Sequence, residues 1–378
     1  MDFRHKILNY CNIFRPGAII LSGGIAKQED YLINKVKEYC KERNYGYKGT
    51  DYKKIKGLDK IKDRIFKATE NNQKIIVYGD YDCDGVCATS IMVKAFEMLG
   101  YNISYYIPTR YHDGYGLSVV NVEKIHKAGF NLIITVDNGI CQNEAIDKAN
   151  ELGMDVIVVD HHEAPEIQVN AFGILHPIIS DISDIYGCGG FMALILSAAL
   201  LDRYDPYLIT LAGLSTISDM MELKSYNRVV VKLALKSLED NKYSSLISLC
   251  DSPIITEKTF GLEIAPKINA IGRLVDDKNI NLLVKFLVSE NADEIFKISS
   301  WIKNTNELRK TLTKEAVEKL PLDNLNEDGI VLNLDIKEGL IGLIANRLLN
   351  EYQVPSIVFT KDSMDENFLK GSIRSKEG

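Results

Sequence analysis

The chain has 378 residues, of which 46% are hydrophobic and 26% are charged, and its formal net charge is -7. This composition excludes disordered, collagen-like and disulfide-stapled proteins. At roughly 100–200 residues per domain, we expect two domains and a smaller appendage. The acidic total also argues against a protein that holds nucleic acid through bulk positive charge.

The cysteines and the apolar runs indicate the compartment. Seven cysteines are scattered along the chain without a Cys-x-x-Cys pair, which indicates neither a disulfide framework nor a zinc ribbon. The apolar run at residues 18–21 is far too short to span a bilayer. We therefore predict a soluble, cytoplasmic protein without a membrane partner.

Residues 41–74 form a locally basic stretch. They hold eleven Lys and Arg against five Asp and Glu, a net charge of +6, and glycines punctuate the first part. The pattern predicts a solvated connector followed by a surface helix.

Beyond Lys74, short β-branched runs alternate with amphipathic segments. The runs are bounded by Gly, Asp or Asn, as buried parallel strands are. Each of the two intervening segments is closed by a glycine that can cap a helix, Gly100 or Gly153. The alternation predicts an α/β fold with a doubly wound parallel sheet. The expected elements are strands at 75–78, 132–136 and 156–159, and helices at 89–99 and 143–152.

The second half of the chain reads as mainly helical, followed by a second β-rich region. Helices are expected at 229–238 and after Asn291, which together with Glu294 resembles a capping box. A strand, a helix and a strand follow at 330–334, 341–350 and 356–359. The domains expected are an N-terminal basic segment (1–65), the sheet domain (66–230), a helical connector (231–325) and an incomplete smaller α/β domain (326–378).

Each of the three expected strands runs directly into acidic residues. The first is followed by Asp80, Asp82 and Asp84, the second by Asp137, and the third by Asp160–His162. The carboxyl ends of neighbouring parallel strands open on one crevice, where ligands bind. We therefore expect five carboxylates and two imidazoles to share one small volume.

Crowded carboxylates repel one another and raise each other's pKa values, unless a multivalent cation turns the repulsion into coordination. Asp82 and Asp84 are two residues apart, so in extended backbone they would face the same way. Gly85 would then permit a sharp turn into the next helix. Mixed Asp and His ligands suit Mn²⁺, and less specifically Mg²⁺ or Zn²⁺. The alternative for any single acid is a helix N-cap.

Asp219 is a fourth candidate, because it follows an apolar, helix-like run at residues 208–214. An Asp in that place is usually a helix cap or a surface residue, so by itself it indicates little.

Three motifs stand in order along the chain: Asp-Tyr-Asp-Cys-Asp-Gly from Asp80, Val-Asp-Asn-Gly from Val136, and Asp-His-His from Asp160. Their order and spacing resemble the DHH phosphoesterase superfamily. From about Lys74 to the end, further segments resemble its RecJ family of single-stranded-DNA-specific exonucleases. These segments are Ile107–Arg110, Asp113–Ser118, Gly187–Gly190, Ser218–Asp219 with Asn227–Arg228, and Pro266–Arg273.

The resemblance implies a DHH catalytic domain with two divalent cations as cofactors, Mn²⁺ before Mg²⁺. A two-metal site of this kind hydrolyses a phosphodiester by in-line displacement, without a covalent nucleophile. Asp137 would be shared by the two ions. The metal ligands implied are Asp80, Asp82, Asp84, Asp137, His161 and Asp219.

The same resemblance implies how the substrate is held. His162 would approach and stabilise the scissile phosphate, and Arg110 and Arg273 would clamp phosphates with bidentate guanidinium groups. Tyr115 is a candidate stacking residue, with a packed core tyrosine as the alternative. Single-stranded DNA would then be contacted locally, by these two arginines and the basic stretch at 41–74.

The distal region resembles the family's DHH-associated domain. Gly339–Arg347 and Gly371–Ser375 match its motifs, which makes Ser372 and Arg374 candidate phosphate-binding residues. Ile336–Lys337 stands where the family usually has Trp-His. The chain ends before the family's glycine-rich motif, so we expect a truncated chain, with a naturally short relative as the alternative.

The leading functional prediction is a metal-dependent 5′→3′ exonuclease that releases 5′-mononucleotides from single-stranded DNA in DNA repair and recombination. Its protein partners would be a single-strand-binding protein or a helicase. The alternative is a phosphodiesterase for short oligonucleotides or cyclic dinucleotides, because that chemistry uses the same metal site. A second alternative is a non-catalytic replication scaffold, although the implied metal ligands are all acid or histidine.

Overall fold

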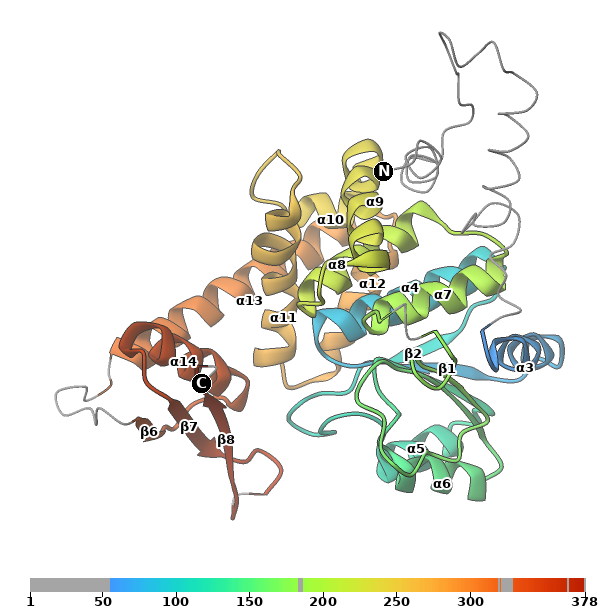
Figure 1. The fold of residues 1–378 in the computed structure, drawn as a ribbon, viewed down its shortest axis with the longest axis horizontal. Coiled ribbons are helices and arrows are strands. Elements are labelled where there is room, and N and C mark those ends of the chain that lie inside the picture. Colours follow the sequence, from blue (N-terminus) through green and yellow to red (C-terminus); the bar gives the residue numbers. More distant parts are fainter. Residues whose placement is uncertain (1–54, 183–185, 319, 321–328, 366, 377–378) are drawn as a thin grey trace, which may run out of the picture.

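The computed structural model describes residues 55–182, 186–318, 320, 329–365 and 367–376. Most of the expected N-terminal basic segment, residues 1–54, lies outside the described residues. Within these ranges, no helix combines the length and the apolar character needed to cross a membrane. Figure 1 shows a sheet domain and a helical region, from which the long helix α13 (Ala292–Glu318) leads to a second, smaller sheet.

The main sheet has five strands in the order β2-β1-β3-β4-β5, and all four pairings are parallel. The three central strands are apolar and almost wholly buried, because helices cover both faces of the sheet. The predicted doubly wound sheet is confirmed, with two short edge strands in addition. The strands are β1 (Ile75–Tyr78), β2 (Ser104–Tyr106), β3 (Leu132–Val136), β4 (Asp155–Val159) and β5 (Gly173–Leu175).

Helices cover the two faces of this sheet in pairs. Helices α4 (Cys83–Met98) and α7 (Gly189–Leu201) lie on one face, and α5 (Val119–Lys127) and α6 (Asn143–Glu151) lie on the other (Figure 1). Successive strand residues point to opposite faces, so Val77 enters the core beneath α4 while Tyr78 enters the core beneath α5 and α6. The carboxyl ends of the strands are therefore left as the edge at which a site can form.

Two helices precede the one predicted at 229–238. Helix α8 (Pro206–Ser218) contains the helix-like run at 208–214, whereas α7 was not predicted, and both pack on α4. Almost every residue of α7 is buried, so its sequence has no amphipathic period by which to recognise it. The later elements are α9 (Ser225–Asn241), α10 (Ser244–Leu249), the π-helix η3 (Thr259–Ile264), α11 (Ala265–Leu274), η4 (Lys278–Asn281) and α12 (Leu282–Val288).

The predicted capping box at the start of α13 is half correct. The Oδ1 of Asn291 accepts a hydrogen bond from the backbone amide of Glu294 at 3.0 Å, so the N-cap forms. The carboxylate of Glu294 pairs with Lys285 of α12. The side chain that was expected to close the box therefore ties two helices together.

The distal unit is a small α/β layer, as predicted. Strands β6 (Ile330–Asn333), β7 (Ser356–Lys361) and β8 (Leu369–Arg374) lie in that order, with β6 parallel and β8 antiparallel to β7. Helix α14 (Glu338–Tyr352) packs on one face through a buried apolar stripe. Leu340, Ile344, Leu348 and Val358 form the centre of that small core.

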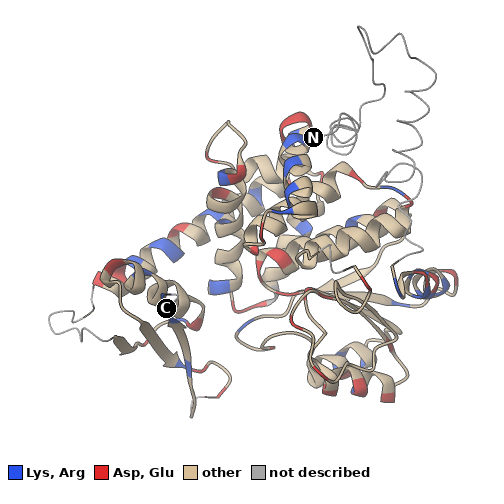
Figure 2. Ribbon diagram, viewed as in Figure 1, with Lys and Arg blue, Asp and Glu red and all other residues tan. Residues whose placement is uncertain are grey.

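The part of the basic stretch that the structure describes lies away from the acidic edge of the sheet. Helix α3 (Leu58–Glu70) is the predicted surface helix, with Ile61 and Ile65 on its buried side. Its Arg64 Nε lies 2.6 Å from Oδ2 of Asp155, the first residue of β4. These cations therefore stand at the amino end of the sheet. Elsewhere the two signs of charge are interspersed, with a run of Lys and Arg along α9 (Figure 2).

Helices α8 and α9 depend on a glycine for their close approach. A Cβ at Gly213 would lie 2.2 Å from the Cβ of Ala234 on α9. We expect Gly213→Val to lower the free energy of unfolding by about 1–3 kcal/mol, because the helices must separate to admit the side chain. Urea denaturation measures the change. Lys232→Val, on the exposed side of α9, is the control and should cost less than about 0.7 kcal/mol; equal losses would contradict the packing argument.

Candidate metal centre

The acids that follow β1 lie at the start of α4. This helix begins at Cys83, earlier than predicted. Asp82 is in extended backbone but Asp84 lies in the first turn of the helix, so the expected extended run through both residues is wrong. Asp82 is the N-cap, and its Oδ1 accepts a hydrogen bond from the Gly85 amide at 3.0 Å. Asp82 is therefore a helix N-cap and also belongs to one of the candidate metal groups. The sequence did not predict that α4 begins this early, because Asp and Gly disfavour a helix interior.

Gly85 serves close packing, and the predicted sharp turn is wrong. The residue lies inside α4, where a Cβ would stand 2.6 Å from the backbone nitrogen of Asp80. Its missing side chain lets the loop that leaves β1 fold directly over the first turn of the helix. Asp80 is thereby buried beside Asp82.

Asp137 follows β3 in a backbone conformation that few residues other than glycine adopt, with φ at 62°. The amide of Asp137 donates to the carbonyl of Val159 at 2.9 Å. A Cβ at Gly189 would lie 2.5 Å from the Cβ of Asp137. Burial raises the pKa of Asp137 well above its usual value, and the charges of Asp84 and other neighbouring carboxylates add to the rise. The protein holds this acid where its charge is unfavourable.

Asp84 is bound by the amino end of α7. Its carboxylate accepts hydrogen bonds from the amides of Gly189 at 2.8 Å and Gly190 at 2.7 Å, and from the hydroxyl of Ser215. A helix N-terminus stabilises a negative charge in this way. The Gly187–Gly190 segment was noted in the sequence, but only the fold reveals that it serves Asp84.

The imidazole of His161 stands among three carboxylates. Its Nε2 lies 3.2 Å from Asp137 Oδ1, 3.6 Å from Asp84 Oδ2 and 3.8 Å from Asp219 Oδ2. Burial lowers the pKa of His161, although the charge of Asp84 opposes this. A neutral imidazole whose Nε2 has no hydrogen-bond partner among the described residues, and which lies among carboxylates, is suited to bind a metal ion.

Asp160 does not join the acid cluster, contrary to the expectation of five carboxylates in one volume. It accepts hydrogen bonds from the amides of Ile140 at 3.0 Å and His161 at 2.7 Å, and from the Nδ1 of His162 at 2.7 Å. Burial alone would raise the pKa of Asp160, but these hydrogen bonds outweigh it and lower the pKa. No local pattern distinguishes Asp160 from the other strand-end acids.

Asp219 is the C-terminal cap of α8, and the packing of that helix on α4 carries it to the cluster. Burial, followed by the charges of Asp84 and Asp82, raises the pKa of Asp219 to about 7. Both readings of the sequence are therefore met, since the residue caps a helix and also lies at the candidate site.

The acids and histidines form three overlapping groups whose ligand atoms lie within 4.8 Å of one another. Three buried atoms of these residues have no hydrogen-bond partner among the described residues: Asp80 Oδ1, Asp137 Oδ1 and His161 Nε2. Oxygen atoms with one or two imidazole nitrogens suit Mn²⁺ and Mg²⁺. The residues present therefore fit divalent cations. The groups are Asp80, Asp82, Asp137; Asp84, His161, Asp219; and Asp137, His161, His162.

Two of the predicted phosphate-binding arginines lie close to this centre. The guanidinium carbon of Arg110 lies 4.3 Å from the ring centroid of Tyr81, and its Nε is buried with no partner in the described part of the chain. Arg273 in α11 donates to the carbonyl of Gly339 at 3.0 Å. Burial lowers the pKa of Arg273 to about 10, and the charge of Arg110 adds to this. Concentrated, partly desolvated cations favour an anionic ligand.

The distal unit contributes a further pair. Arg374 of β8 donates to the Oγ of Ser372 at 3.1 Å, and both side chains stand 3.3 Å from the place of a Cβ at Gly342. Lys337 does not join them. Its Nζ donates to the carbonyl of Leu274 at 2.8 Å and lies 3.2 Å from Asp276, so it ties α11 to the distal unit.

Tyr115 is not a core residue, since it is 48% exposed. Its hydroxyl lies 3.0 Å from Nε2 of His162, and the two rings meet edge to face with centroids 5.8 Å apart. The packed-core alternative is therefore wrong, and the stacking role stays a prediction.

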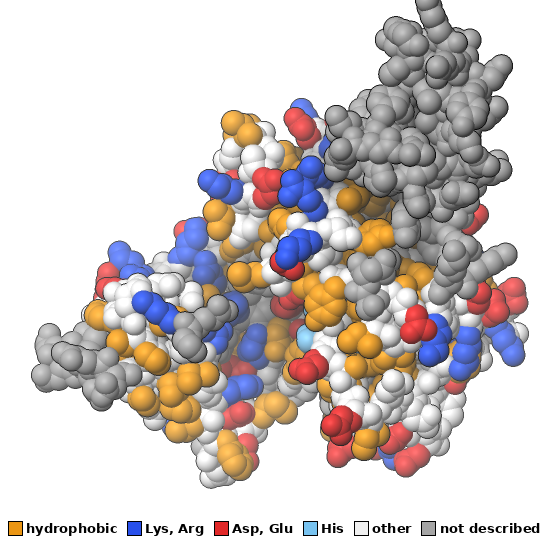
Figure 3. All heavy atoms as spheres, viewed as in Figure 1, with side chains coloured by type: hydrophobic (Ala, Val, Ile, Leu, Met, Phe, Trp, Pro, Cys, Tyr) orange, Lys and Arg blue, Asp and Glu red, His pale blue; other side chains and the backbone are white. Residues whose placement is uncertain are grey.

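The surface is hollowed between the sheet domain and the distal unit. Figure 3 shows a His side chain in this hollow and Lys and Arg side chains on its distal wall.

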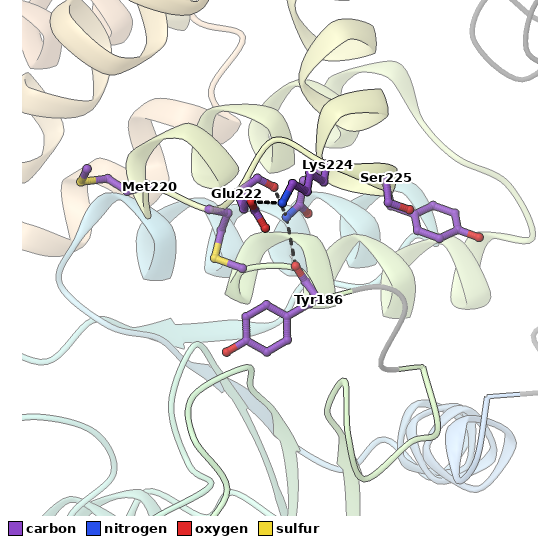
Figure 4. Close-up of a pocket in the computed structure, with 8 residues that line it drawn as sticks. Tyr186, Met220, Glu222, Lys224 and Ser225 are labelled. Atoms are coloured by element: carbon purple, nitrogen blue, oxygen red, sulfur yellow. Dashed lines mark hydrogen bonds and ion pairs between the residues drawn. The ribbon is translucent and has the colours of Figure 1, made fainter.

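A separate pocket of about 400 Å³ is lined mainly by residues that follow α8 in the chain, and it contains none of the metal-group residues (Figure 4). The pocket is lined by Tyr186, Met220, Met221, Glu222, Lys224, Ser225, Tyr226 and Asn227.

Residues 74–218 match the DHH family, N-terminal domain. This segment is therefore similar to a DHH family domain. The match covers the main sheet, the helices on both of its faces and every strand end that carries an acid of the metal groups.

Curated relatives of the chain are RecJ proteins. The single-stranded-DNA-specific exonuclease RecJ of Bacillus subtilis is 34% identical over 339 residues, which are 86% of this chain and 42% of the relative. The RecJ of Escherichia coli is 29% identical over 360 residues, 86% of this chain and 62% of the relative. The chain thus spans about half the length of the curated relatives it matches.

Solved RecJ structures share the fold. RecJ of Thermus thermophilus in complex with Mn²⁺ has a TM-score of 0.74 at 27% identity, covering 85% of this chain and 48% of that chain. An exonuclease RecJ bound to manganese has a TM-score of 0.76 at 27% identity, covering 85% of this chain and 83% of that chain. The Thermus protein has also been crystallised with Mg²⁺.

The raised pKa of Asp219 predicts how the metal-free protein responds to pH. Because the folded state holds this proton more tightly than the unfolded state, the carboxyl's contribution to stability falls as the pH rises from 3.8 to about 7. In EDTA, we expect Tm to fall more for the native protein than for Asp219→Asn between pH 5 and 7.5. Mn²⁺ should reduce that difference; parallel curves in EDTA would contradict the assignment.

Proposed function

We propose that this chain carries the nuclease core of a metal-dependent 5′→3′ exonuclease that hydrolyses single-stranded DNA to 5′-mononucleotides. The observation that carries the proposal is the buried, overlapping set of acid and histidine ligands centred on Asp137. Buried carboxylates that lack protein partners need a cation, and phosphodiester hydrolysis is the chemistry of paired divalent cations. The RecJ relatives, which are named as single-stranded-DNA-specific exonucleases, support single-stranded DNA as the substrate.

Asp80, Asp82 and Asp137 would hold one cation. The second would be held by Asp84, His161 and Asp219 together with Asp137, which joins the two sets. Bound Mn²⁺ or Mg²⁺ would neutralise these carboxylates and lower the pKa of the attacking water.

His162 would supply positive charge at the scissile phosphate. Its hydrogen bond to the carboxylate of Asp160 raises the pKa of the imidazole and so favours the protonated form. An imidazolium next to a phosphate oxygen can stabilise, through its positive charge, the negative charge that develops in the transition state. Asp160 would act through His162 and make no contact of its own with the substrate.

Four groups would hold the phosphates of the strand. The charge of Arg110 acts on Asp80 and that of Asp82 on Arg273, so both arginines stand next to the metal groups. Arg374 of the distal unit, which donates to Ser372, is close enough to Arg273 for its charge to lower the pKa of that guanidinium. The Nε of Arg110 is the clearest of these, because it is buried and lacks a partner among the described residues. A covalent nucleophile is not required, and Cys83 and Cys87 are fully buried packing residues.

The cellular setting follows from the proposed substrate. Enzymes that shorten single strands serve DNA repair and recombination, and a single-strand-binding protein or a helicase would present the strand. Such work takes place in the cytoplasm of a bacterium, and the free thiols of Cys83, Cys87 and Cys188 fit a reducing compartment.

Substrate degradation tests the proposal directly. The chain is incubated with 5′-labelled single-stranded DNA, a short RNA oligomer and a cyclic dinucleotide, each with Mn²⁺ or with EDTA. We expect Mn²⁺-dependent release of mononucleotides from the long single strand. Cleavage of the short or cyclic substrates alone would support the oligonucleotide phosphodiesterase in its place. Absence of cleavage on all three, with Mn²⁺ bound, would support the scaffold.

Asp137→Asn tests the shared ligand. Asn tolerates the left-handed backbone at this position, so the fold should survive while the negative charge is lost. We expect cleavage to be abolished and the number of Mn²⁺ ions bound, measured by calorimetry, to fall. Asp155→Asn is the control, because that acid stands at the opposite end of β4 and pairs with Arg64. Near-full activity of Asp137→Asn would refute the ligand assignment.

A further inference from the structure

The loop that carries Tyr115 is anchored on both sides of that residue. On the amino-terminal side, the carboxylate of Asp113 accepts hydrogen bonds from three residues. On the carboxyl-terminal side, the hydroxyl of Tyr78 donates to the carbonyl of Gly116 at 3.2 Å. The exposed ring therefore sits on a fixed backbone. The donors to Asp113 are the Tyr106 hydroxyl at 2.9 Å, the Thr109 amide at 2.9 Å and the Asn121 side chain at 3.0 Å.

Two glycines direct the tyrosine toward His162. Gly114 and Gly116 flank Tyr115 with φ of 76° and 72°, a conformation that suits glycine. At Gly116 a Cβ would lie 2.5 Å from the side-chain nitrogen of Gln142, so the loop passes close to this side chain. This backbone brings the Tyr115 hydroxyl to His162, with the ring edge-on and not stacked.

The hydrogen bonds of His162 leave one nitrogen for the tyrosine. Nδ1 donates to Asp160, whose carboxylate is occupied by further amide donors, so Nε2 is the nitrogen 3.0 Å from the Tyr115 hydroxyl. A neutral imidazole accepts from that hydroxyl, and an imidazolium donates to its oxygen. The contact is therefore satisfied in both charge states.

Packing holds His162 only in part, because its side chain is 43% exposed and its ring lies against that of His161, with the centroids 4.5 Å apart. A ring held at one nitrogen can still pivot about that hydrogen bond. A second hydrogen bond at Nε2, on the opposite side of the ring, restricts the pivot.

We propose that Tyr115 is a positioning residue that acts through its hydroxyl on His162, and that its ring face is not a stacking platform for a base. The chain Asp160–His162–Tyr115 would hold the imidazole where it meets the scissile phosphate. This inference rests on the proposed nuclease function, because a role for His162 at a phosphate is part of that function.

Tyr115→Phe separates the two roles, since it keeps the ring and removes the hydroxyl. We expect kcat on single-stranded DNA to fall about tenfold, the effect of one lost hydrogen bond to a charged group, with KM within about twofold. Tyr101→Phe, which removes a hydroxyl near the amino end of β2, is the control and should be neutral. A neutral Tyr115→Phe combined with a raised KM for Tyr115→Leu would overturn the proposal in favour of stacking.

A double-mutant cycle tests whether the tyrosine acts through His162. With His162→Gln in place, Tyr115→Phe should cost no further activity, because the group that it positions is gone. Independent, multiplicative losses would overturn the proposal.

A measurement without activity keeps the test independent of the proposed function. In metal-free protein with ¹⁵N-labelled histidine, Tyr115→Phe should shift the Nε2 resonance of His162, whereas Tyr101→Phe should not. An unchanged resonance would overturn the contact itself. If the native protein fails to degrade single-stranded DNA but cleaves a short oligonucleotide, the kinetics of the Tyr115 variants are compared on that oligonucleotide. The same changes in kcat and KM then support or overturn the positioning role.

Discussion

The burial of several like charges at the edge of one parallel sheet is the constraint on which the rest of this structure depends. The protein compensates some of these acids itself: the amides of α7 bind Asp84, and amides and His162 bind Asp160. Asp80 and Asp137 keep buried oxygens without a partner among the described residues. The acids thus divide into those that the fold satisfies and those without a partner among the described residues, and the second set belongs to the candidate metal centre.

Glycines let the backbone segments around the candidate metal centre approach one another closely. A Cβ at Gly272 would lie 2.2 Å from the carbonyl oxygen of Tyr81, and one at Gly339 would lie 2.2 Å from that of Arg273. Helix α11 is therefore pressed between the loop after β1 and the start of α14. Because of these contacts, Arg273 reaches the centre from the helical region, and the distal unit closes the other side of the hollow (Figure 3).

The charges explain how an acidic chain can suit a nucleic acid. The net charge of -7 includes acids of the metal groups, which bound cations would neutralise. The described part of the basic stretch does not compensate for them, because Arg64 of α3 pairs at the amino end of β4. Positive charge at the site instead comes from arginines of three separate regions, Arg110, Arg273 and Arg374. The negative total charge therefore does not argue against the proposed nucleic-acid substrate.

The sequence by itself determined the central strands and the acids at their ends, because β-branched runs are local signals and parallel strands must share one carboxyl edge. Only the tertiary structure decided that Asp219 reaches His161, that Asp160 serves His162, and that the Tyr115 hydroxyl faces the same imidazole. Two of these contacts, those of Asp219 and Tyr115, join residues far apart in the chain, through the packing of α8 on α4 and the fixed loop after β2. No local pattern encodes such distances, since they arise only when separate elements pack against one another.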